Sequence, residues 1–386
     1  MSQKVAILGS TGSIGRQSLE IMGYHPEHFT VELLTANDNW KMLARQAKEF
    51  RPSAVAIANQ EHYHKLNDAL LDEDIKVYAG EDAVAQAAAG GEIDTVIAAL
   101  VGFAGMKSTI SAIKAGKKIA LANKETMVVA GELITALSRE YKAPILPVDS
   151  EHSAILQCIT GETSPLKRII ITASGGALRD YTPEQMETAT PEQALRHPSW
   201  SMGTKITIDS ATMMNKGFEV IEAKWFFGLV PSQIEVVMHP QSIIHSFVEL
   251  ADGSVKAQLG LADMRLPIQY ALTYPDRLAM PSGAKYNPAD FNLTFCEPDL
   301  RKYPCLTIAY QVMEQGGNMP CAANAANEIA VKAFLKGKII FTKIHRIIED
   351  TLMATTFRKT GSFDDIYDTD RTAREAAEKF VTKHQV

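Results

Sequence analysis

Short apolar runs alternate with stretches of helical periodicity through the first 150 residues of the chain. The apolar runs contain few polar positions, which is typical of strands buried on both faces of a parallel sheet. The stretches between most of them suit crossover helices. The pattern therefore predicts an α/β fold with a Rossmann-like, doubly wound parallel sheet, and its strands are expected at 4–9, 30–36, 54–58, 94–100, 117–123 and 143–148.

A different pattern begins after residue 150. Four stretches resemble strands and predict a second sheet, at 166–174, 234–239, 242–250 and 254–260. The Asp252-Gly253 pair favours a hairpin between the last two stretches. The segment 283–304 is rich in Pro and Asn and predicts a linker, and the rest of the chain has the periodicity of a small helical bundle. We expect an α+β domain at 151–282 and a helical domain at 305–386.

The composition narrows the possible classes of protein. The chain has 386 residues, with 46% hydrophobic and 22% charged, which suits a globular protein of several domains. A formal net charge of −6 argues against a nucleic-acid partner. No apolar run approaches the ~20 residues of a membrane helix, and the first strand begins too near Met1 for a targeting segment. We expect a cytoplasmic protein that does not bind membranes.

A glycine-rich turn follows the first predicted strand. Gly9, Gly12 and Gly15 lie between that strand and a helix, where glycines permit a tight turn and close approach of backbone N–H groups to a pyrophosphate. The context predicts dinucleotide binding, and the alternative is that the glycines only tighten the turn.

The residues after the second strand bear on which dinucleotide binds. An acid at this position usually binds the ribose hydroxyls of NAD, whereas a basic residue accommodates NADP. Asp38 favours NAD by this rule, while Lys41 and Arg16 are near enough in sequence to serve a 2′-phosphate. The sequence does not decide whether NAD or NADP is the preferred cofactor.

Two acids, Asp149 and Glu151, follow the apolar run at 145–148. If the strand continues through them, their side chains point the same way. Carboxylates so close oppose one another unless a cation lies between them. Together with an acid from the second domain they would form an all-oxygen site, which selects magnesium or manganese.

Other polar clusters follow predicted strands. Lys124 and Glu125 come directly after the run at 117–123, at the sheet edge where ligands bind, although a solvated ion pair is the alternative. A polar loop from residue 208 leads into a helix on which Asn215, Glu219 and Glu222 share a face. We expect a phosphate near this loop, since it also contains Ser210 and Lys216.

Two further stretches suggest an anion site and its cover. Ser174 precedes two glycines at a predicted strand end, a sequence suited to a backbone nest for an anion. His197 and Trp200 lie in a segment punctuated by Pro and Gly, which predicts a mobile lid that would exclude water.

Eight motifs in this sequence resemble those of the 1-deoxy-D-xylulose 5-phosphate reductoisomerase family. In chain order they are GSTGSIG, LANKE, VDSEHSA, SGG, RHPSWSMG, DSATMMNKGFEVIEA, HPQSIIHS and ADMRLPI. The resemblance implies an NADPH-binding domain at 1–150, a catalytic domain with a flexible lid, and a homodimer. It also implies a reaction of the non-mevalonate isoprenoid pathway, in which isomerisation and hydride transfer produce 2-C-methyl-D-erythritol 4-phosphate.

The resemblance also implies residue roles, carried over by position. The Mn²⁺ or Mg²⁺ ligands are Asp149, Glu151 and Glu219, which with Lys124 form the catalytic set. The substrate contacts are Lys124, Ser150, Glu151, Ser174, His197, Trp200, Ser210, Asn215, Lys216 and Glu219. The NADPH contacts are Thr11, Gly12, Ser13, Ile14, Asn37, Asp38, Asn39, Asn123, Glu125 and Gly203.

The sequence departs from the family pattern at one place. Well-known members carry Gly-Lys-Asn after the second strand, where this chain has Asn37, Asp38 and Asn39. NADPH remains the cofactor that the resemblance implies, and the acid places its preference over NADH in question.

Two alternative functions can be weighed against the resemblance. A semialdehyde dehydrogenase would need a nucleophilic cysteine, for which Cys158 is the candidate. A catalytically inactive NADP-binding regulator would not need the acids described above. Because the four cysteines show no paired spacing, we expect them to be buried free thiols. Among the histidines, His239 and His245 are expected to be structural, and the role of His152 stays open.

Overall fold

The computed structural model describes residues 2–280 and 286–385, so the predicted linker residues 283–285 lie outside it. The chain divides into two compact units. Unit 1 comprises Met1–Thr126, Ile134–Ser153 and Asp263–Gly283, and unit 2 comprises Met127–Leu133, Ala154–Ala262 and Ala284–Val386. The predicted domain division at residues 150, 282 and 304 stays a prediction.

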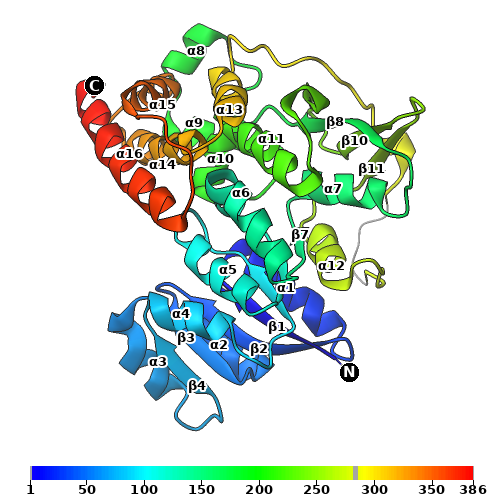
Figure 1. Ribbon diagram of the computed structural model, residues 1–386, viewed down its shortest axis with the longest axis vertical. Helices are drawn as coiled ribbons and strands as arrows, with labels where there is room; N and C mark the ends of the chain where they lie inside the picture. Colours follow the sequence, from blue (N-terminus) through cyan, green and yellow to red (C-terminus); the bar gives the residue numbers. More distant parts are fainter. Residues whose placement is uncertain (1, 281–285, 386) are drawn as a thin grey trace. The chain divides into compact units, whose positions relative to one another are not determined.

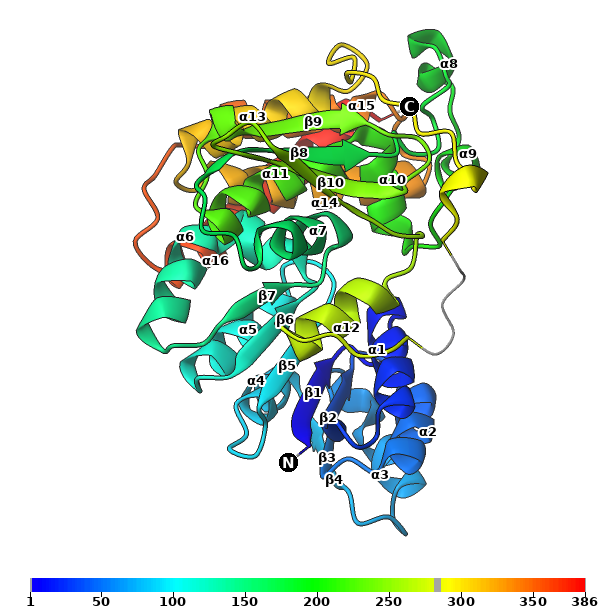
Figure 2. The same ribbon diagram turned by 90° about the vertical axis from the view of Figure 1, so that its right-hand side faces the viewer.

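Unit 1 contains a seven-stranded sheet in the order β4-β3-β2-β1-β5-β6-β7, with all neighbours parallel (Figure 2). The chain crosses from one side of β1 to the other between β4 and β5, which opens a crevice for ligands at the carboxyl ends of the strands. The predicted parallel sheet is confirmed. Its strands are β1 (Gln3–Leu8), β2 (Phe29–Ala36), β3 (Ala54–Ile57), β4 (Lys76–Ala79), β5 (Thr95–Ala98), β6 (Lys118–Leu121) and β7 (Ile145–Pro147).

The hydrophobic pattern does not predict strand β4. Its four residues alternate between exposed and half-buried positions, and it pairs only with β3 at the edge of the sheet. A short edge strand lacks the continuous apolar run by which the buried strands were recognised. The central strand β1 shows that signal clearly, since Val5 and Ile7 are fully buried.

Helices connect the strands of unit 1 and cover the sheet (Figure 1). In chain order they are α1 (Ser13–Tyr24), α2 (Trp40–Phe50), η1 (Gln60–His62), α3 (Tyr63–Ala69), α4 (Glu81–Ala88), α5 (Gly105–Lys114), α6 (Lys124–Glu140) and α12 (Arg265–Thr273). Although α12 comes late in the sequence, it packs against α1. The guanidinium of Arg265 donates to Glu20 of α1 at 2.7 Å, which adds an ion pair to that contact.

Unit 2 contains a four-stranded sheet in the order β11-β10-β8-β9. Strands β10 and β11 form the predicted antiparallel hairpin, and α11 packs on β8 and β9. The bounds are α7 (Ser150–Ile159), β8 (Leu166–Ala173), α8 (Pro183–Glu187), α9 (Pro191–Ala194), α10 (Thr204–Thr212), α11 (Met214–Phe227), η2 (Pro231–Gln233), β9 (Ile234–Met238), β10 (Ile244–Leu250), β11 (Val255–Leu259) and η3 (Pro288–Asp290). Helices α6 and α7 contribute residues to both units.

The C-terminal part of unit 2 is the predicted helical bundle. Its helices are α13 (Pro304–Gln315), α14 (Met319–Leu335), α15 (Lys343–Ala354) and α16 (Phe363–Lys383). The helices α14, α15 and α16 pack together, as Figure 1 shows. Their core contains the small buried residues Ala322, Ala325 and Ala373, which let helices approach closely. Ser362 and Asp365 form a capping box that begins α16.

Within the part of the chain that the structure describes, no helix is both long and apolar enough to cross a membrane.

Candidate active site

The turn between β1 and α1 has the geometry of a phosphate-binding turn. Gly9 has a φ of +85°, and a Cβ on Gly15 would lie 2.5 Å from the Gly9 carbonyl oxygen. Gly12 is the N-cap of α1 and makes no side-chain cap, so backbone N–H groups of the first helical turn remain available to a ligand. The other predicted cofactor contacts in this turn are Thr11, Ser13 and Ile14.

The residues after β2 form a polar rim beside this turn. Asp38 accepts hydrogen bonds from Nδ2 of Asn37 at 2.6 Å and from Nδ2 of Asn59 at 2.8 Å. Asn39 is the N-cap of α2, and its Oδ1 accepts from the backbone N–H of Met42 at 3.2 Å. The predicted contacts at 37–39 therefore lie at the carboxyl edge of the sheet, where Rossmann folds bind the adenosine ribose.

Asn123 and Glu125 hold the start of α6. The buried amide of Asn123 donates to the Gly102 carbonyl oxygen at 2.9 Å and to Oε2 of Glu125 at 3.1 Å. Its Oδ1 accepts from the N–H of Thr126 at 2.9 Å, which caps the helix. The alternative of a solvated Lys124-Glu125 pair is wrong, since Lys124 is 8% exposed and Glu125 is 6% exposed.

A helix start, not a strand, positions Asp149 and Glu151. Strand β7 ends at Pro147 and α7 begins at Ser150. Oδ1 of Asp149 accepts from the backbone N–H groups of Glu151 at 3.2 Å and His152 at 3.4 Å. The predicted strand alternation was wrong here, because the chain enters a helix and the carboxylate satisfies N–H groups that lack intrahelical partners.

Side chains around Asp149 hold its carboxylate in place. The ammonium of Lys124 pairs with Oδ2, and both side chains are largely buried. Nδ1 of the fully buried His152 lies 3.1 Å from Oδ1. Ser150 donates its hydroxyl to Oε2 of Glu151. His152, whose role the sequence left open, therefore lies against the carboxylate of Asp149.

Glu219 is held by residues of its own helix. Nδ2 of Asn215 donates to Oε1 at 2.6 Å, and the ammonium of Lys216 pairs with Oε2. These residues precede Glu219 by three or four positions, so they share its face of α11. Glu219 is fully buried and Lys216 is 4% exposed, so this charge pair is shielded from water.

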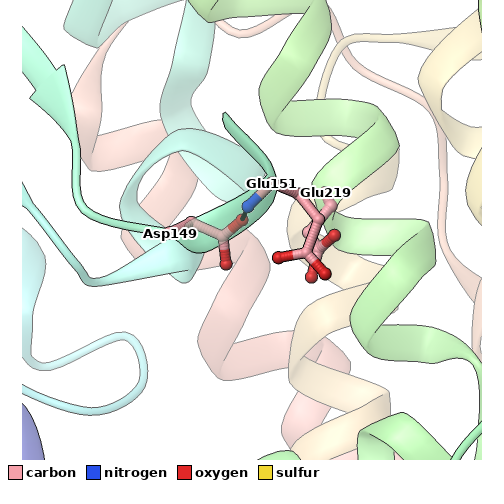
Figure 3. A group of neighbouring side chains, drawn as sticks. All are labelled: Asp149, Glu151 and Glu219. Atoms are coloured by element: carbon pink, nitrogen blue, oxygen red, sulfur yellow. Dashed lines mark hydrogen bonds between the residues drawn. The ribbon is translucent and has the colours of Figure 1, made fainter. Parts of the chain in front are cut away.

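Asp149, Glu151 and Glu219 form a group of carboxylates (Figure 3). Each offers one oxygen, and these oxygens lie within 4.8 Å of one another. Carboxylates this close repel one another unless a cation lies among them. A donor set made only of oxygen fits magnesium or manganese better than zinc.

The stretch before Glu219 is helical, which corrects the predicted polar loop. Ser210 lies in α10, and α10 passes into α11 through Met213, whose φ of +63° is left-handed. The β-branched and polar residues of this stretch have low helix propensity. Propensity alone therefore does not predict a helix here. Ile208 and Ala211 are fully buried, and this tertiary packing stabilises the helix.

Asp209 is a buried acid whose role no sequence motif indicates. It is 2% exposed, and its carboxylate accepts from Nδ2 of Asn327 at 2.8 Å and lies 3.0 Å from the ammonium of Lys205. The contact with Asn327 attaches α10 to α14 beside Ser210. Since Asn327 is 118 positions away along the chain, no local pattern could have indicated the pair.

Ser174 and His197 are directly bonded to each other. Nδ1 of His197 accepts from the backbone N–H groups of Ser199 at 3.2 Å and Trp200 at 3.0 Å. The proton of the neutral ring therefore lies on Nε2, which donates to Oγ of Ser174 at 3.0 Å. Burial, and to a lesser extent Arg179, lowers the pKa of His197 to about 4. The imidazole is consequently a neutral hydrogen-bond donor near pH 7.

The two glycines after Ser174 form a tight turn against α10. Gly175 has a φ of +82° and Gly176 a φ of +68°, and the N–H of Gly176 donates to Oγ of Ser174 at 3.2 Å. A Cβ on Gly176 would lie 2.7 Å from backbone atoms of Ala211. The turn thus places the predicted nest directly beside α10, the helix that contains Ser210.

The segment with Trp200 has no helix or strand between Leu195 and Gly203, and Gly203 is the N-cap of α10. The Trp200 ring lies 6.1 Å from the ring of the buried His245. His239 is structural, as predicted, because Nδ1 donates to the Thr294 carbonyl oxygen at 3.0 Å while Nε2 accepts from two backbone N–H groups. Motion of the predicted lid stays a prediction.

Cys158 does not have the properties of a nucleophile. It is 5% exposed, and burial raises the pKa of its thiol. A nucleophilic cysteine needs an accessible thiolate. The semialdehyde dehydrogenase alternative is therefore not supported. Three of the four cysteines are buried as predicted, and Cys296 is exposed, contrary to that prediction.

Comparison with known proteins identifies one family along the chain. The family described as 1-deoxy-D-xylulose 5-phosphate reductoisomerase matches residues 5–131, its C-terminal domain matches residues 145–227, and a further DXP reductoisomerase C-terminal domain matches residues 259–376.

Full-length relatives carry the same name. The 1-deoxy-D-xylulose 5-phosphate reductoisomerase of Bacteroides fragilis is 55% identical over 386 residues, covering 99% of this chain and 98% of the relative. The protein of that name from Chloroherpeton thalassium is 50% identical and is covered completely. The enzyme from Zymomonas mobilis, solved in complex with NADPH, has a TM-score of 0.92 at 43% identity, with 99% of both chains covered. A DOX-P reductoisomerase solved with NADPH, fosmidomycin and magnesium has a TM-score of 0.93 at 39% identity, with 98% of both covered.

Proposed function

The chain belongs to the 1-deoxy-D-xylulose 5-phosphate reductoisomerase family, and on that basis we propose how its residues share the reaction. The enzyme converts 1-deoxy-D-xylulose 5-phosphate to 2-C-methyl-D-erythritol 4-phosphate and depends on NADPH and a divalent metal. The observation that carries the assignment of roles is the carboxylate group of Asp149, Glu151 and Glu219, whose ligand oxygens lie within 4.8 Å of one another.

Those three carboxylates would hold Mg²⁺ or Mn²⁺, since they supply only hard oxygen donors. When bound, the ion acts as a Lewis acid that polarises the substrate's oxygens and stabilises developing negative charge. Lys124 and His152 keep Asp149 oriented, and Asn215 and Lys216 keep Glu219 oriented. Their contacts lessen the rearrangement needed when the cation enters.

The substrate phosphate would bind at the contact of the Ser174 turn with α10. Ser174 and Ser210 offer hydroxyl donors, and His197 supplies a neutral N–H that fixes the Ser174 hydroxyl. Lys216 supplies positive charge close to α10. Holding the phosphate keeps the reacting carbons in place while bonds break and form. Trp200 would cover the bound substrate and exclude water.

The ammonium of Lys124 would serve the reacting end of the substrate. It is largely buried at the first position of α6, and it contacts Asp149, one of the proposed metal ligands. An ammonium in this position can donate a hydrogen bond to an oxygen that gains negative charge. Ser150, which follows Asp149, would bind a substrate hydroxyl.

NADPH would bind along the carboxyl edge of the unit 1 sheet. The β1–α1 turn fits its pyrophosphate, because Gly15 lets α1 begin directly against the backbone of Gly9 and Ser10 and no side chain caps the first N–H groups of α1. Residues 37–39 would meet the adenosine ribose, and Asn123, Glu125 and Gly203 would contact the cofactor nearer the nicotinamide. The cofactor supplies the hydride that reduces the isomerised aldehyde.

The metal-site assignment can be tested with Asp149→Asn and Glu151→Gln, which keep the size of each side chain. NADPH oxidation with 1-deoxy-D-xylulose 5-phosphate and Mn²⁺ is expected to fall at least about a thousandfold, because a Lewis acid contributes several kcal/mol to the barrier. Mn²⁺ binding, followed by electron paramagnetic resonance, should weaken in parallel. Asp252→Asn, in an exposed hairpin turn, is the control and should behave like the wild type. Variants at 149 or 151 that retain wild-type turnover would refute the assignment.

We also propose that the enzyme is a cytoplasmic homodimer. Strand β11 is an edge strand of the unit 2 sheet, and Val255 and Leu259 on it are 56% and 39% exposed, which supports pairing with a second chain. Four free cysteines suit a reducing compartment. Sedimentation equilibrium should give twice the chain mass of 42.2 kDa, and a single-chain mass would exclude the dimer.

A further inference from the structure

A carboxylate stands where the adenosine ribose of the cofactor is expected to lie. We propose that Asp38 binds the 2′-hydroxyl of NADH and thereby makes this chain accept NADH as well as NADPH. The inference rests on the proposed function, in which the β1–α1 turn holds the cofactor pyrophosphate. It concerns the choice between the two nicotinamide cofactors, not the reaction itself.

The position of Asp38 follows from the topology of unit 1. It comes two residues after β2, the immediate neighbour of β1 in the sheet. In Rossmann folds an acid at this place hydrogen-bonds the ribose hydroxyls of NAD. The backbone links the adjacent loops as well, because the N–H of Asn59 donates to the Asn37 carbonyl oxygen at 3.1 Å.

Neighbouring amides hold the Asp38 carboxylate before any cofactor binds. Nδ2 of Asn59 donates to Oδ1 at 2.8 Å, and Nδ2 of Asn37 donates to Oδ2 at 2.6 Å. Asn59 is itself fixed, since its Oδ1 accepts from the N–H of Glu61 at 3.0 Å. Nε2 of His62 lies 4.0 Å from Oδ1 of Asp38. Such support lowers the entropic cost of ordering Asp38 around a ligand.

The carboxylate still has capacity for the ribose. An ionised carboxylate offers about four lone-pair positions, of which the two amide contacts use only part. The Asp38 side chain is 61% exposed, so its remaining lone pairs are accessible. Hydrogen bonds to a charged acceptor contribute roughly 1.5–3 kcal/mol, enough to change cofactor affinity by about tenfold or more.

The same charge works against the 2′-phosphate of NADPH. Like charges a few ångströms apart repel each other, and more strongly near a protein surface than in bulk water. A hollow of about 440 Å³ beside Asn59 adds little positive charge, because its Lys107 pairs with Asp82 and Glu81 also lines it. Lys41 and Arg16 are exposed near this edge and offset part of the repulsion, which keeps NADPH as a ligand.

Direct binding measurements separate this inference from the overall function. The dissociation constants of NADH and NADPH can be measured by calorimetry without substrate or metal. We expect the wild-type values to lie within about tenfold of each other. Asp38→Asn should shift their ratio about tenfold towards NADPH, because it removes the repulsion and weakens the acceptor. Asp38→Lys should shift the ratio further in the same direction.

Asp72→Asn is the matched control. Asp72 is an exposed acid in the turn before β4, at the amino edge of the same sheet. Its substitution by Asn removes the same charge at a place away from the expected cofactor site. The ratio of the NADH and NADPH dissociation constants of this variant should equal that of the wild type. Circular dichroism checks that each variant is folded.

The possible results distinguish the two claims. A wild type that binds NADPH a thousandfold more tightly than NADH, or a folded Asp38→Asn variant with an unchanged ratio, overturns the role of Asp38. A wild type that binds neither nucleotide overturns the proposed function instead.

Discussion

At the scale of single residues, each proposed site residue takes its character from its immediate partners. His197 shows this clearly, because its Nδ1 accepts two backbone N–H groups and its Nε2 must then carry the proton toward Ser174. Asp149 acts in a similar way, as a helix cap that also faces Lys124. One hydrogen bond at such positions decides which atom is a donor and which is an acceptor.

We predict that His197 titrates near pH 4. Burial lowers its pKa from the ordinary value of 6.5 to about 4, so between these values the unfolded chain binds more protons than the folded chain. The stability that His197 contributes is therefore present above pH 6.5 and is lost as the pH falls through 4. NMR of the ring protons measures the midpoint, and His197→Gln identifies the signal. A midpoint close to 6.5 would contradict the buried donor role.

At the scale of elements, the proposed phosphate site depends on how the Ser174 turn meets α10. Gly176 leaves no room for a side chain there, while Asp209 attaches the other side of α10 to α14 through Asn327. Helix α10 is thus held between a turn and a helix. The position of Ser210 follows from these two contacts, neither of which lies within α10 itself.

Gly176→Ala should disturb this contact. The new Cβ would lie 2.7 Å from the Ala211 backbone, so either the turn or α10 has to move. We expect a loss of about 2–4 kcal/mol in the free energy of unfolding and a raised KM for the substrate.

Gly161→Ala is the control for this substitution. Its φ of +83° is also left-handed, but nothing lies within 4 Å of the added Cβ. Gly161→Ala should lower the free energy of unfolding by only about 1 kcal/mol and leave the KM for the substrate unchanged. Urea unfolding and steady-state kinetics measure both quantities. Equal effects of the two substitutions would mean that backbone strain, not the contact with α10, causes the loss.

At the scale of the whole molecule, binding of the metal and folding are linked. An ion that binds only the folded chain stabilises it by an amount set by its concentration and dissociation constant. The carboxylates of Asp149, Glu151 and Glu219 lie close together, so relief of their mutual repulsion is one contribution to the affinity that sets this dissociation constant.

Mn²⁺ at one hundred times its dissociation constant should therefore stabilise the protein by about 2.7 kcal/mol. The shift is measured as a rise in Tm by differential scanning fluorimetry, and EDTA should reverse it. Glu219→Gln should abolish most of the rise, whereas Glu235→Gln, on the exposed side of β9, should keep it. A rise of equal size in the Glu219→Gln protein would mean that the ion binds elsewhere.

Much of the fold could be predicted from local patterns. Continuous apolar runs identified the buried strands of the unit 1 sheet, because a strand buried on both faces leaves no place for polar residues. The pattern did not predict the edge strand β4, which has no buried residue, or the helix α10, which is stabilised by packing and not by propensity. The three carboxylates were recognised as candidate metal ligands, but the reason given for the proximity of the first two was wrong.

The sequence by itself determined which residues could do chemistry and which segments would be buried, because side-chain type and periodicity are local properties. Only the tertiary structure decided which distant atoms meet. Asn59 and Asp38 are 21 positions apart, and Asn327 and Asp209 are 118 apart. Hydrophobic patterning specifies which face of an element turns inward, and it says nothing about which partner lies there. Asn59 decides whether the Asp38 carboxylate is already ordered at the proposed ribose site. Asn327 decides how firmly α10 is held at the proposed phosphate site.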